Sequence, residues 1–208
     1  MPEIQLLDQA TINQIAAGEV IDRPSSVVKE LLENAIDAKA TAITVEIKDG
    51  GISFIRITDN GCGIEKDQVR KAFLRHATSK LHTIDDLLDI GSLGFRGEAL
   101  SSIAAIAQVE PISKPPEAML GISYQIEDGE EKSLTQIGAP DGTTILVRNL
   151  FYHVPARKKF LKTAATEGNY INQLMENMAM LRPDISMRFI NGGQNKLYTS
   201  GNGRLKDL

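Results

Sequence analysis

The sequence predicts an α+β fold, a two-layer sandwich in which helices cover one face of a largely antiparallel, mixed sheet. Two alternating apolar runs separated by Asp49-Gly50-Gly51 indicate a hairpin, and Gly192-Gly193 indicates a second one. The segment that begins at Pro24 has the apolar periodicity of a helix packed against a core. Because strands joined by short turns run antiparallel, we expect most of the sheet to be antiparallel.

Length and composition fit a single globular domain. The chain has 208 residues, 42% hydrophobic and 24% charged, and its net charge of -4 argues against a protein that coats DNA. No run of about 18 apolar residues predicts a membrane span, and the N-terminus lacks the pattern of a signal peptide. The single cysteine, Cys62, permits no internal disulfide and no cysteine-based zinc site, which suits a reducing cytoplasm.

The elements can be placed in order along the chain. The segment 11–17 is expected to be a helix that Gly18 ends. A stronger helix is expected from Pro24 to about Ala38, with the proline near its first position. Its apolar stripe comprises Val28, Leu31, Leu32 and Ala35. Further helices are expected over 65–73, 97–107 and 167–182, and strands at 43–47, 55–57, near 124 and 133, and at 144–148, with 113–116 as a linker-like interruption.

Polar side chains line one face of the helix that begins at Pro24. Glu30, Asn34 and Asp37 are four and three residues apart, which places them opposite the apolar stripe. A solvated surface is one explanation, although Glu33 and Asp37 form a like-charge i, i+4 pair and Asn34 is an indifferent helix former. The other explanation is a catalytic face, with Glu30 as a general base for water and the Asn34 amide oxygen on Mg²⁺. This stretch alone leaves the two explanations about even.

Two glycine clusters follow. Asp59-Asn60-Gly61-Cys62-Gly63 stands at a strand end, where a tight turn explains the glycines, and where the Asp59 carboxylate could accept a hydrogen bond from the adenine amino group. Cys62 is expected to be a small buried or packing residue. The segment from Gly91 to Leu100 leads into a helix, whose first N–H groups can bind an anion. Because it is neither a Walker A motif nor Gly-x-Gly-x-x-Gly, phosphate binding there would be of another type.

Three further segments have ordinary explanations beside functional ones. The stretch His76 to Lys80 is a polar connection that could meet phosphate or simply cap a helix. Asp141 to Ile145 is typical of a turn that enters a strand. Ala156 to Lys162 is the most basic stretch, and the acidic total favours a solvated helix face over a nucleic-acid site. His76, His82 and His153 show no metal-ligand spacing.

Four elements in a fixed order resemble the ATPases that unite DNA gyrase, the heat-shock chaperone, histidine kinases and MutL. They are Glu30-x-x-Glu33-Asn34-Ala35-x-Asp37-Ala38, Asp59-x-Gly61-x-Gly63, Gly94-Phe95-Arg96-Gly97-Glu98-Ala99-Leu100 and Gly142-Thr143. Within that superfamily the chain looks like the MutL family of mismatch repair proteins, through Asn13 to Val20, His76 to Lys80 and Gly94 to Leu100. The resemblance covers essentially the whole chain and implies the Bergerat ATP-binding sandwich.

The resemblance implies an ATPase with ATP and Mg²⁺ as cofactors. Glu30 would be the catalytic base and Asn34 the metal ligand, while Asp59 and Gly63 would lie at the adenine and Thr143 near the nucleotide. The other implied nucleotide contacts are Thr78, Ser79, Lys80, Leu93, Gly94, Phe95, Arg96 and Gly97. The motif Phe95-Arg96-Gly97-Glu98 disfavours a gyrase-like topoisomerase or a chaperone.

The resemblance also implies partners. Residues 1–20, with Ile4 to Ile12, would be an arm through which the ATP-bound protein self-associates. The other implied partners would be the mismatch-recognition protein MutS and a downstream repair nuclease or helicase. DNA would be bound weakly and mainly through the full-length protein, and no membrane would be bound. Residues 1–208 would be the ATPase domain, without the second domain that supplies a lysine to the terminal phosphate or the C-terminal region, so turnover would be slow or absent. An ATP-gated binding module, in which hydrolysis only resets the clamp, is the alternative.

Overall fold

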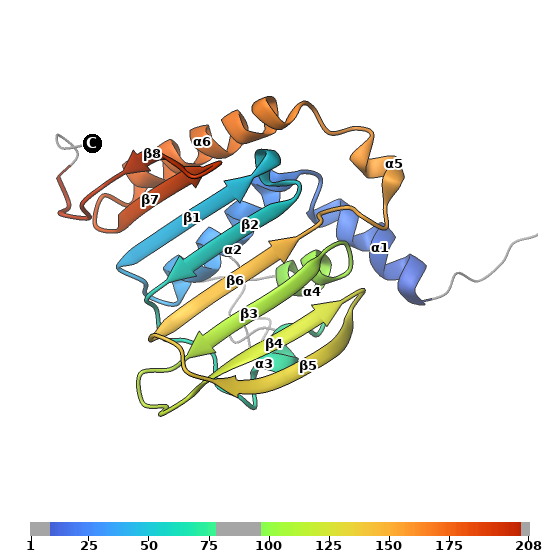
Figure 1. The fold of residues 1–208 in the computed structure, drawn as a ribbon, viewed down its shortest axis with the longest axis horizontal. Helices are drawn as coiled ribbons and strands as arrows, with labels where there is room; N and C mark the ends of the chain where they lie inside the picture. The colour runs from blue at the N-terminus through green and yellow to red at the C-terminus, as the bar shows by residue number, and fades with distance from the viewer. Residues whose placement is uncertain (1–8, 78–96, 205–208) are drawn as a thin grey trace, which may run out of the picture.

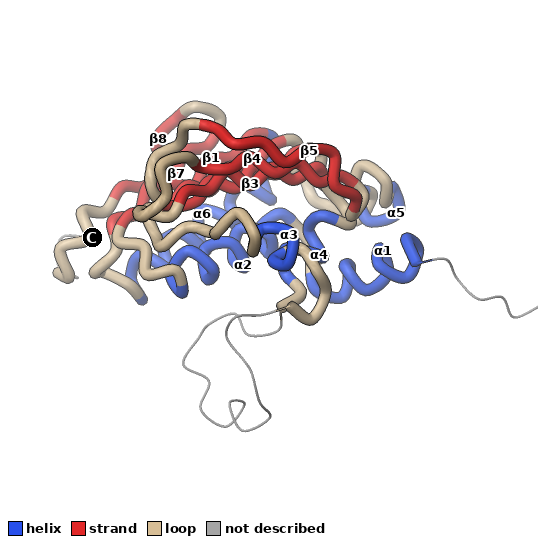
Figure 2. Tube along the Cα trace, turned by 90° about the horizontal axis from the view of Figure 1, so that it is seen from below, coloured by secondary structure: helices blue, strands red, loops and turns tan. Residues whose placement is uncertain are grey.

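The computed structural model describes residues 9–77 and 97–204, which form one eight-stranded sheet with helices on one of its faces (Figures 1 and 2). The strand order is β5-β4-β3-β6-β2-β1-β7-β8. Within this sheet β1 and β7 run parallel, and the other neighbouring pairs are antiparallel. The strands are β1 (Ala42–Lys48), β2 (Phe54–Asp59), β3 (Gln108–Lys114), β4 (Gly121–Glu127), β5 (Glu130–Ile137), β6 (Gly142–Arg148), β7 (Ser186–Asn191) and β8 (Gln194–Tyr198). The predicted α+β sandwich with a mixed, largely antiparallel sheet is confirmed.

The longer helices form the second layer, below the sheet in Figure 2. The helices are α1 (Gln9–Val20), α2 (Pro24–Asp37), η1 (Asp49–Gly51), α3 (Val69–Ala72), α4 (Ala99–Ala104), α5 (Pro155–Lys158) and α6 (Ala164–Leu181). The apolar stripe of α2 is buried against α6 and β2, as predicted. Leu31 and Leu32 are almost completely inaccessible to solvent, and each contributes about 1.5–3 kcal/mol by leaving water. Among the described helices, none has the length and apolar character needed to cross a membrane.

Gly18 does not end the first helix, contrary to the prediction. Helix α1 continues through it to Val20. A Cβ atom at this position would lie 1.4 Å from the Arg157 guanidinium carbon, so the glycine makes room for an arginine from α5. The Arg157 Nη1 atom donates to the carbonyl of Ile21 at 3.3 Å, just beyond the end of α1. The basic stretch is therefore not simply a solvated face, because Arg157 packs against the N-terminal helix.

Strand β3 was not predicted, although it lies at the centre of the sheet between β4 and β6. It contains Pro111, which has no N–H group and is unusual in a central strand. The pairing of β3 with β4 passes from Val109 to Ile112 without Glu110 or Pro111, whereas Pro111 is in register with Ile145 of β6. The two helices that precede β3 in the chain, α3 and α4, are shorter than expected.

Candidate functional site

A row of polar side chains crosses the helix-covered face of the sheet. Asp59 of β2 is in register with Thr143 of β6, and Thr143 is in register with Ser113 of β3. Residues paired directly across antiparallel strands project from the same face. On this face the next residues along β2 and β6, Ile57 and Ile145, are buried. The three polar residues, which we call the polar row, therefore interrupt an otherwise apolar surface.

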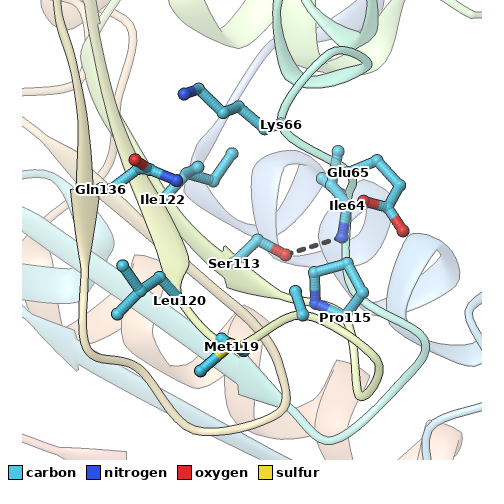
Figure 3. A pocket seen from close by; sticks show the side chains of 10 residues that line it. Ile64, Glu65, Lys66, Ser113, Pro115, Met119, Leu120, Ile122 and Gln136 are labelled. Carbon is cyan, nitrogen blue, oxygen red and sulfur yellow. Dashed lines mark hydrogen bonds between the residues drawn. The ribbon is translucent and has the colours of Figure 1, made fainter.

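Ser113 lies at one end of the polar row and makes three hydrogen-bond contacts. Its hydroxyl accepts the backbone N–H of Ile64 at 2.8 Å (Figure 3). It donates to the carbonyl of Gly142 at 3.1 Å, and its oxygen lies 2.8 Å from the Thr143 hydroxyl. With 1% of its surface exposed, Ser113 is a buried link between β3, β6 and the loop that follows β2.

Asp59 lies at the other end of the polar row. Burial raises the pKa of its carboxyl group above the ordinary value, because an ionised carboxylate loses hydration there. Backbone N–H groups of Gly61 and Thr143 oppose part of that rise by hydrogen bonding to the carboxylate, with Gly61 N at 2.8 Å from Oδ1. The arrangement provides an acceptor in a partly dry environment.

The loop after β2 is fixed against the end of α2. The backbone N–H of Cys62 donates to the carbonyl of Ala38 at 3.0 Å, and the Asn60 side chain accepts the N–H groups of Thr41 and Ala42, each at 2.9 Å. The end of α2 therefore lies beside the loop that leaves the polar row. Cys62 itself is exposed, so its expected role as a small packing residue is wrong.

Two glycines are required where backbones approach closely. Gly63 has a φ of +72°, and a Cβ there would lie 2.7 Å from the carbonyl oxygen of Lys114. Gly142 has a φ of +106°, and a Cβ there would lie 2.1 Å from the carbonyl oxygen of Asp59. Both conformations and both contacts favour glycine. The predicted turn at residues 59–63 and the predicted strand entry at 141–145 therefore meet in space.

The polar stripe of α2 is half-buried rather than solvated. Glu30, Asn34 and Asp37 all have intermediate exposure, which weakens the explanation of the stripe as a solvated surface. Glu33 has a structural partner, because its carboxylate lies 3.5 Å from the Lys29 ammonium one turn away. This ion pair offsets the like-charge pair of Glu33 with Asp37.

The chain approaches itself again at residues 77 and 97. Gly97 has a φ of +62°, and a Cβ there would lie 2.7 Å from the carbonyl oxygen of Ala77. Nearby, the Nδ1 atom of His76 lies 3.1 Å from the Glu98 carboxylate, so this histidine is a surface residue with an acidic neighbour. The predicted contacts Thr78, Ser79, Lys80, Leu93, Gly94, Phe95 and Arg96 lie outside the described residues, as does His82.

A cavity of about 240 Å³ borders the polar row at Ser113 (Figure 3). Ile64, Pro115, Leu120, Ile122 and Gln136 are among the residues that line it, and Glu30, Asn34, Asp59 and Thr143 do not. The cavity therefore borders the Ser113 end of the polar row and not the Asp59 end. In the described part of the chain, no group of three or more His, Cys, Asp or Glu residues is arranged to hold a metal ion.

Two residues of this arrangement were not singled out from the sequence. Ser113 was expected in a linker-like interruption at 113–116, and this prediction is wrong, because Ser113 lies in β3, the strand that Pro111 concealed. Its position opposite Thr143 was therefore not foreseen. Asn60 was counted only as part of the turn after Asp59, although its side chain joins that turn to the start of β1. The alternation of Val109, Pro111 and Ser113 was the available indication of β3.

Comparisons with known proteins agree on one group. Residues 22–145 match the family model for histidine kinase-, DNA gyrase B- and HSP90-like ATPases. The whole chain is similar to the DNA mismatch repair protein MutL of Agathobacter rectalis, with 64% identity over 208 residues, and to that of Clostridium tetani, with 48% identity over 207 residues. It covers 32% and 33% of these relatives, so the chain spans about a third of their length.

Solved structures lead to the same group. The Aquifex aeolicus MutL ATPase domain complexed with ADP matches with a TM-score of 0.74 and 31% identity, over 88% of this chain and 65% of that one. The N-terminal domain of a DNA repair protein matches with a TM-score of 0.79 and 31% identity, over 94% of this chain and 58% of that one. Both therefore share the fold described above and a similar sequence.

Proposed function

The chain belongs to the MutL family, within the histidine kinase-, DNA gyrase B- and HSP90-like ATPases, and on this premise we propose that it binds Mg²⁺–ATP between α2 and the polar row and hydrolyses it. The observation that carries the proposal is the hydrogen bond from Cys62 N to Ala38 O. It holds the end of α2, one turn beyond Asn34, against the loop that starts at Asp59. This contact supports a single site bordered by residues that are far apart in sequence.

On the base side, the Asp59 carboxylate accepts a hydrogen bond from the adenine amino group, and Thr143 lies next to it in register. The conformation of Gly63 keeps a side chain away from the flat ring at the point where the backbone approaches Lys114. In the ADP complex of the Aquifex aeolicus domain, a protein with this fold holds a nucleotide with the same base.

On the phosphate side, Glu30 acts as general base for the attacking water, an assistance typically worth about 10²–10⁴-fold in rate. The Asn34 amide oxygen holds Mg²⁺, which neutralises phosphate charge when bound. The donor set fits this ion, because Mg²⁺ commonly takes one or two protein oxygens and completes its shell with phosphates and water. Thr78, Ser79, Lys80 and the segment from Leu93 to Gly97 supply the remaining phosphate contacts.

For the longer protein we infer an ATP-driven switch in DNA mismatch repair in the cytoplasm. ATP binding closes two copies through residues 1–20, of which 1–8 lie outside the described part of the chain. The closed state couples recognition by MutS to a downstream nuclease or helicase, with DNA contacted weakly. The similarity of the whole chain to curated MutL proteins supports this role.

A nucleotide titration with and without Mg²⁺ tests the proposal. With a non-hydrolysable ATP analogue, Mg²⁺ should tighten binding about tenfold in the wild type, and Asn34→Ala should lose that gain. Asn177→Ala, an exposed amide on α6, is the matched control and should keep it. Equal Mg²⁺ dependence in all three proteins would contradict the role of Asn34, and binding of ATP without turnover would favour a binding module over an ATPase.

A further inference from the structure

The hydrogen bonds of Ser113 can all be satisfied in one way only. A serine hydroxyl has one donor hydrogen and two acceptor lone pairs. The Ile64 N–H can only donate to it, and the Gly142 carbonyl can only accept from it. The single hydrogen of Ser113 is then committed to Gly142, so the contact of 2.8 Å with Thr143 is a hydrogen bond only if Thr143 donates it.

This arrangement of hydrogen bonds makes the Thr143 hydroxyl a hydrogen-bond acceptor toward the rest of the site. Once its hydrogen points to Ser113, the Thr143 oxygen presents only lone pairs to the rest of the site. Asp59, the neighbour of Thr143 in the register, is an acceptor as well when ionised. Two acceptors side by side suit an amino group, which has two N–H donors. They oppose an oxo group, whose lone pairs would face theirs at the cost of unsatisfied polar atoms.

We propose that Ser113 is a specificity-determining positioning residue, which orients the Thr143 hydroxyl so that the site accepts a 6-aminopurine and rejects a 6-oxopurine. The inference rests on the proposed nucleotide site and adds a residue outside the motifs that define it. Ser113 acts through Thr143 and does not itself touch the base. The hydrogen bond that the Ser113 hydroxyl accepts from the Ile64 backbone holds the loop after β2 in place. Loss of that hydrogen bond would weaken the binding of all nucleotides alike.

Binding of ADP and inosine diphosphate by the whole chain separates these effects. Inosine diphosphate carries an oxo group and a protonated N1 where ADP has an amino group and a free N1. Wild type should prefer ADP strongly. Ser113→Ala should lower the ratio of the Kd for inosine diphosphate to the Kd for ADP about tenfold. The Thr143 hydroxyl is then free to rotate and donate a hydrogen bond to the oxo group. Ser123→Ala removes another buried serine hydroxyl, on β4, and should leave the ratio unchanged.

Two results keep the inference apart from the proposed function. A wild type that bound both nucleotides equally, or neither, would overturn the adenine site and the inference with it. A selective wild type with an equally selective Ser113→Ala variant would overturn the inference alone, even if both affinities fell. If Ser113→Ala fails to fold by circular dichroism, Ser113→Cys, whose thiol is a weak donor and acceptor, is measured against the same criteria.

Discussion

The two sides of the proposed nucleotide site are built in different ways. The base side stands on three adjacent strands, where Asp59, Thr143 and Ser113 are held by the sheet register and by buried hydrogen bonds. The phosphate side presents Glu30 and Asn34 from one face of a helix, where both are half-buried. We therefore expect base recognition to be formed on folding, and we expect the bound nucleotide and its metal ion to complete the phosphate side.

This difference predicts that the two sides fail differently when they are mutated. A change on the phosphate side removes a group that matters in the transition state, so it lowers the rate of hydrolysis with little effect on folding. A change on the base side disturbs groups that support one another in the folded chain, so it lowers stability and affinity together. Three measurements test this contrast.

The largest effect is expected on the phosphate side. Glu30→Ala should lower the rate of ATP hydrolysis about 10²–10⁴-fold, because no group then takes the proton of the attacking water. The Kd for ATP should stay within about twofold of the wild type. Single-turnover hydrolysis with protein in excess, together with a binding titration, measures both quantities.

Glu33→Ala is the matched control, since Glu33 lies on the same helix but pairs with Lys29. It should keep the wild-type rate and fold stably, because its i, i+4 ion pair with the exposed Lys29 contributes only a few tenths of a kcal/mol to the free energy of unfolding. If Glu30→Ala and Glu33→Ala had equal rates, Glu30 would not be the base. If Glu30→Ala unfolded the chain, the contrast between the two sides would break down.

A smaller effect, on folding, is expected on the base side. Gly63 and Gly129 have nearly the same φ, +72° and +75°, but a Cβ at Gly63 would press on the Lys114 backbone, while nothing lies within 4 Å of one at Gly129. Substitution by alanine should cost each protein about 1–2 kcal/mol of backbone strain. Gly63→Ala should cost about 2 kcal/mol more, because a backbone cannot move aside cheaply.

Urea denaturation of the two variants gives the difference directly, because the backbone strain nearly cancels between them. Equal free energies of unfolding would mean that the loop after β2 yields easily. The folded chain would then not hold the base side in a fixed conformation. An ADP titration of Gly63→Ala should also show weaker binding, while Gly129→Ala should bind as the wild type does.

The sequence predicted the parts of this molecule that follow from local patterns. Alternating apolar residues at 43–47 and 55–57 located the hairpin of β1 and β2, and the stripe on α2 predicted its buried face. The motif residues Asp59, Gly63 and Thr143 were picked out as well, and the register brings the strand ends that carry Asp59 and Thr143 together. The hairpin and the buried face of α2 depend on neighbours in sequence, which is why the sequence predicts them, whereas the roles of the motif residues come from the family resemblance.

What the sequence did not reveal depends on contacts between distant segments. The predicted helix end at Gly18 is wrong because the contact that requires a glycine there, with the Arg157 side chain, comes from 139 positions away in the chain. Strand β3 was missed because Pro111 breaks the sequence pattern of a strand. Whether a proline is tolerated in a strand depends on which neighbouring strand would need its N–H group as a hydrogen-bond donor, and here that depends on how β3 pairs with β4 and β6. Ser113 was missed for the same reason, since its role depends on the contact of its hydroxyl with the Thr143 hydroxyl, which the local sequence does not show.

The smallest effect is a change in the pKa of the Asp59 carboxyl group, and it tests the base side without mutation. Burial holds this pKa above the ordinary value of 3.8. The folded chain therefore binds a proton more tightly than the unfolded chain does. The free energy of unfolding contributed by Asp59 falls as pH rises through the window from 3.8 to the raised pKa. An adenine amino group donates to the ionised form, so ADP should lower this pKa, and ADP should bind more weakly below it.

An NMR titration of the carboxyl carbons measures that change, with Asp59→Asn to assign the resonance. Asp184 is the internal control, because its pKa is lowered by a hydrogen bond from Arg182 and should not respond to ADP. A pKa of Asp59 that ADP raised or left unchanged would show that the carboxylate does not receive the amino group. The base side would then present hydrogen-bond acceptors that are fixed by the sheet but are not bound by the amino group of the nucleotide.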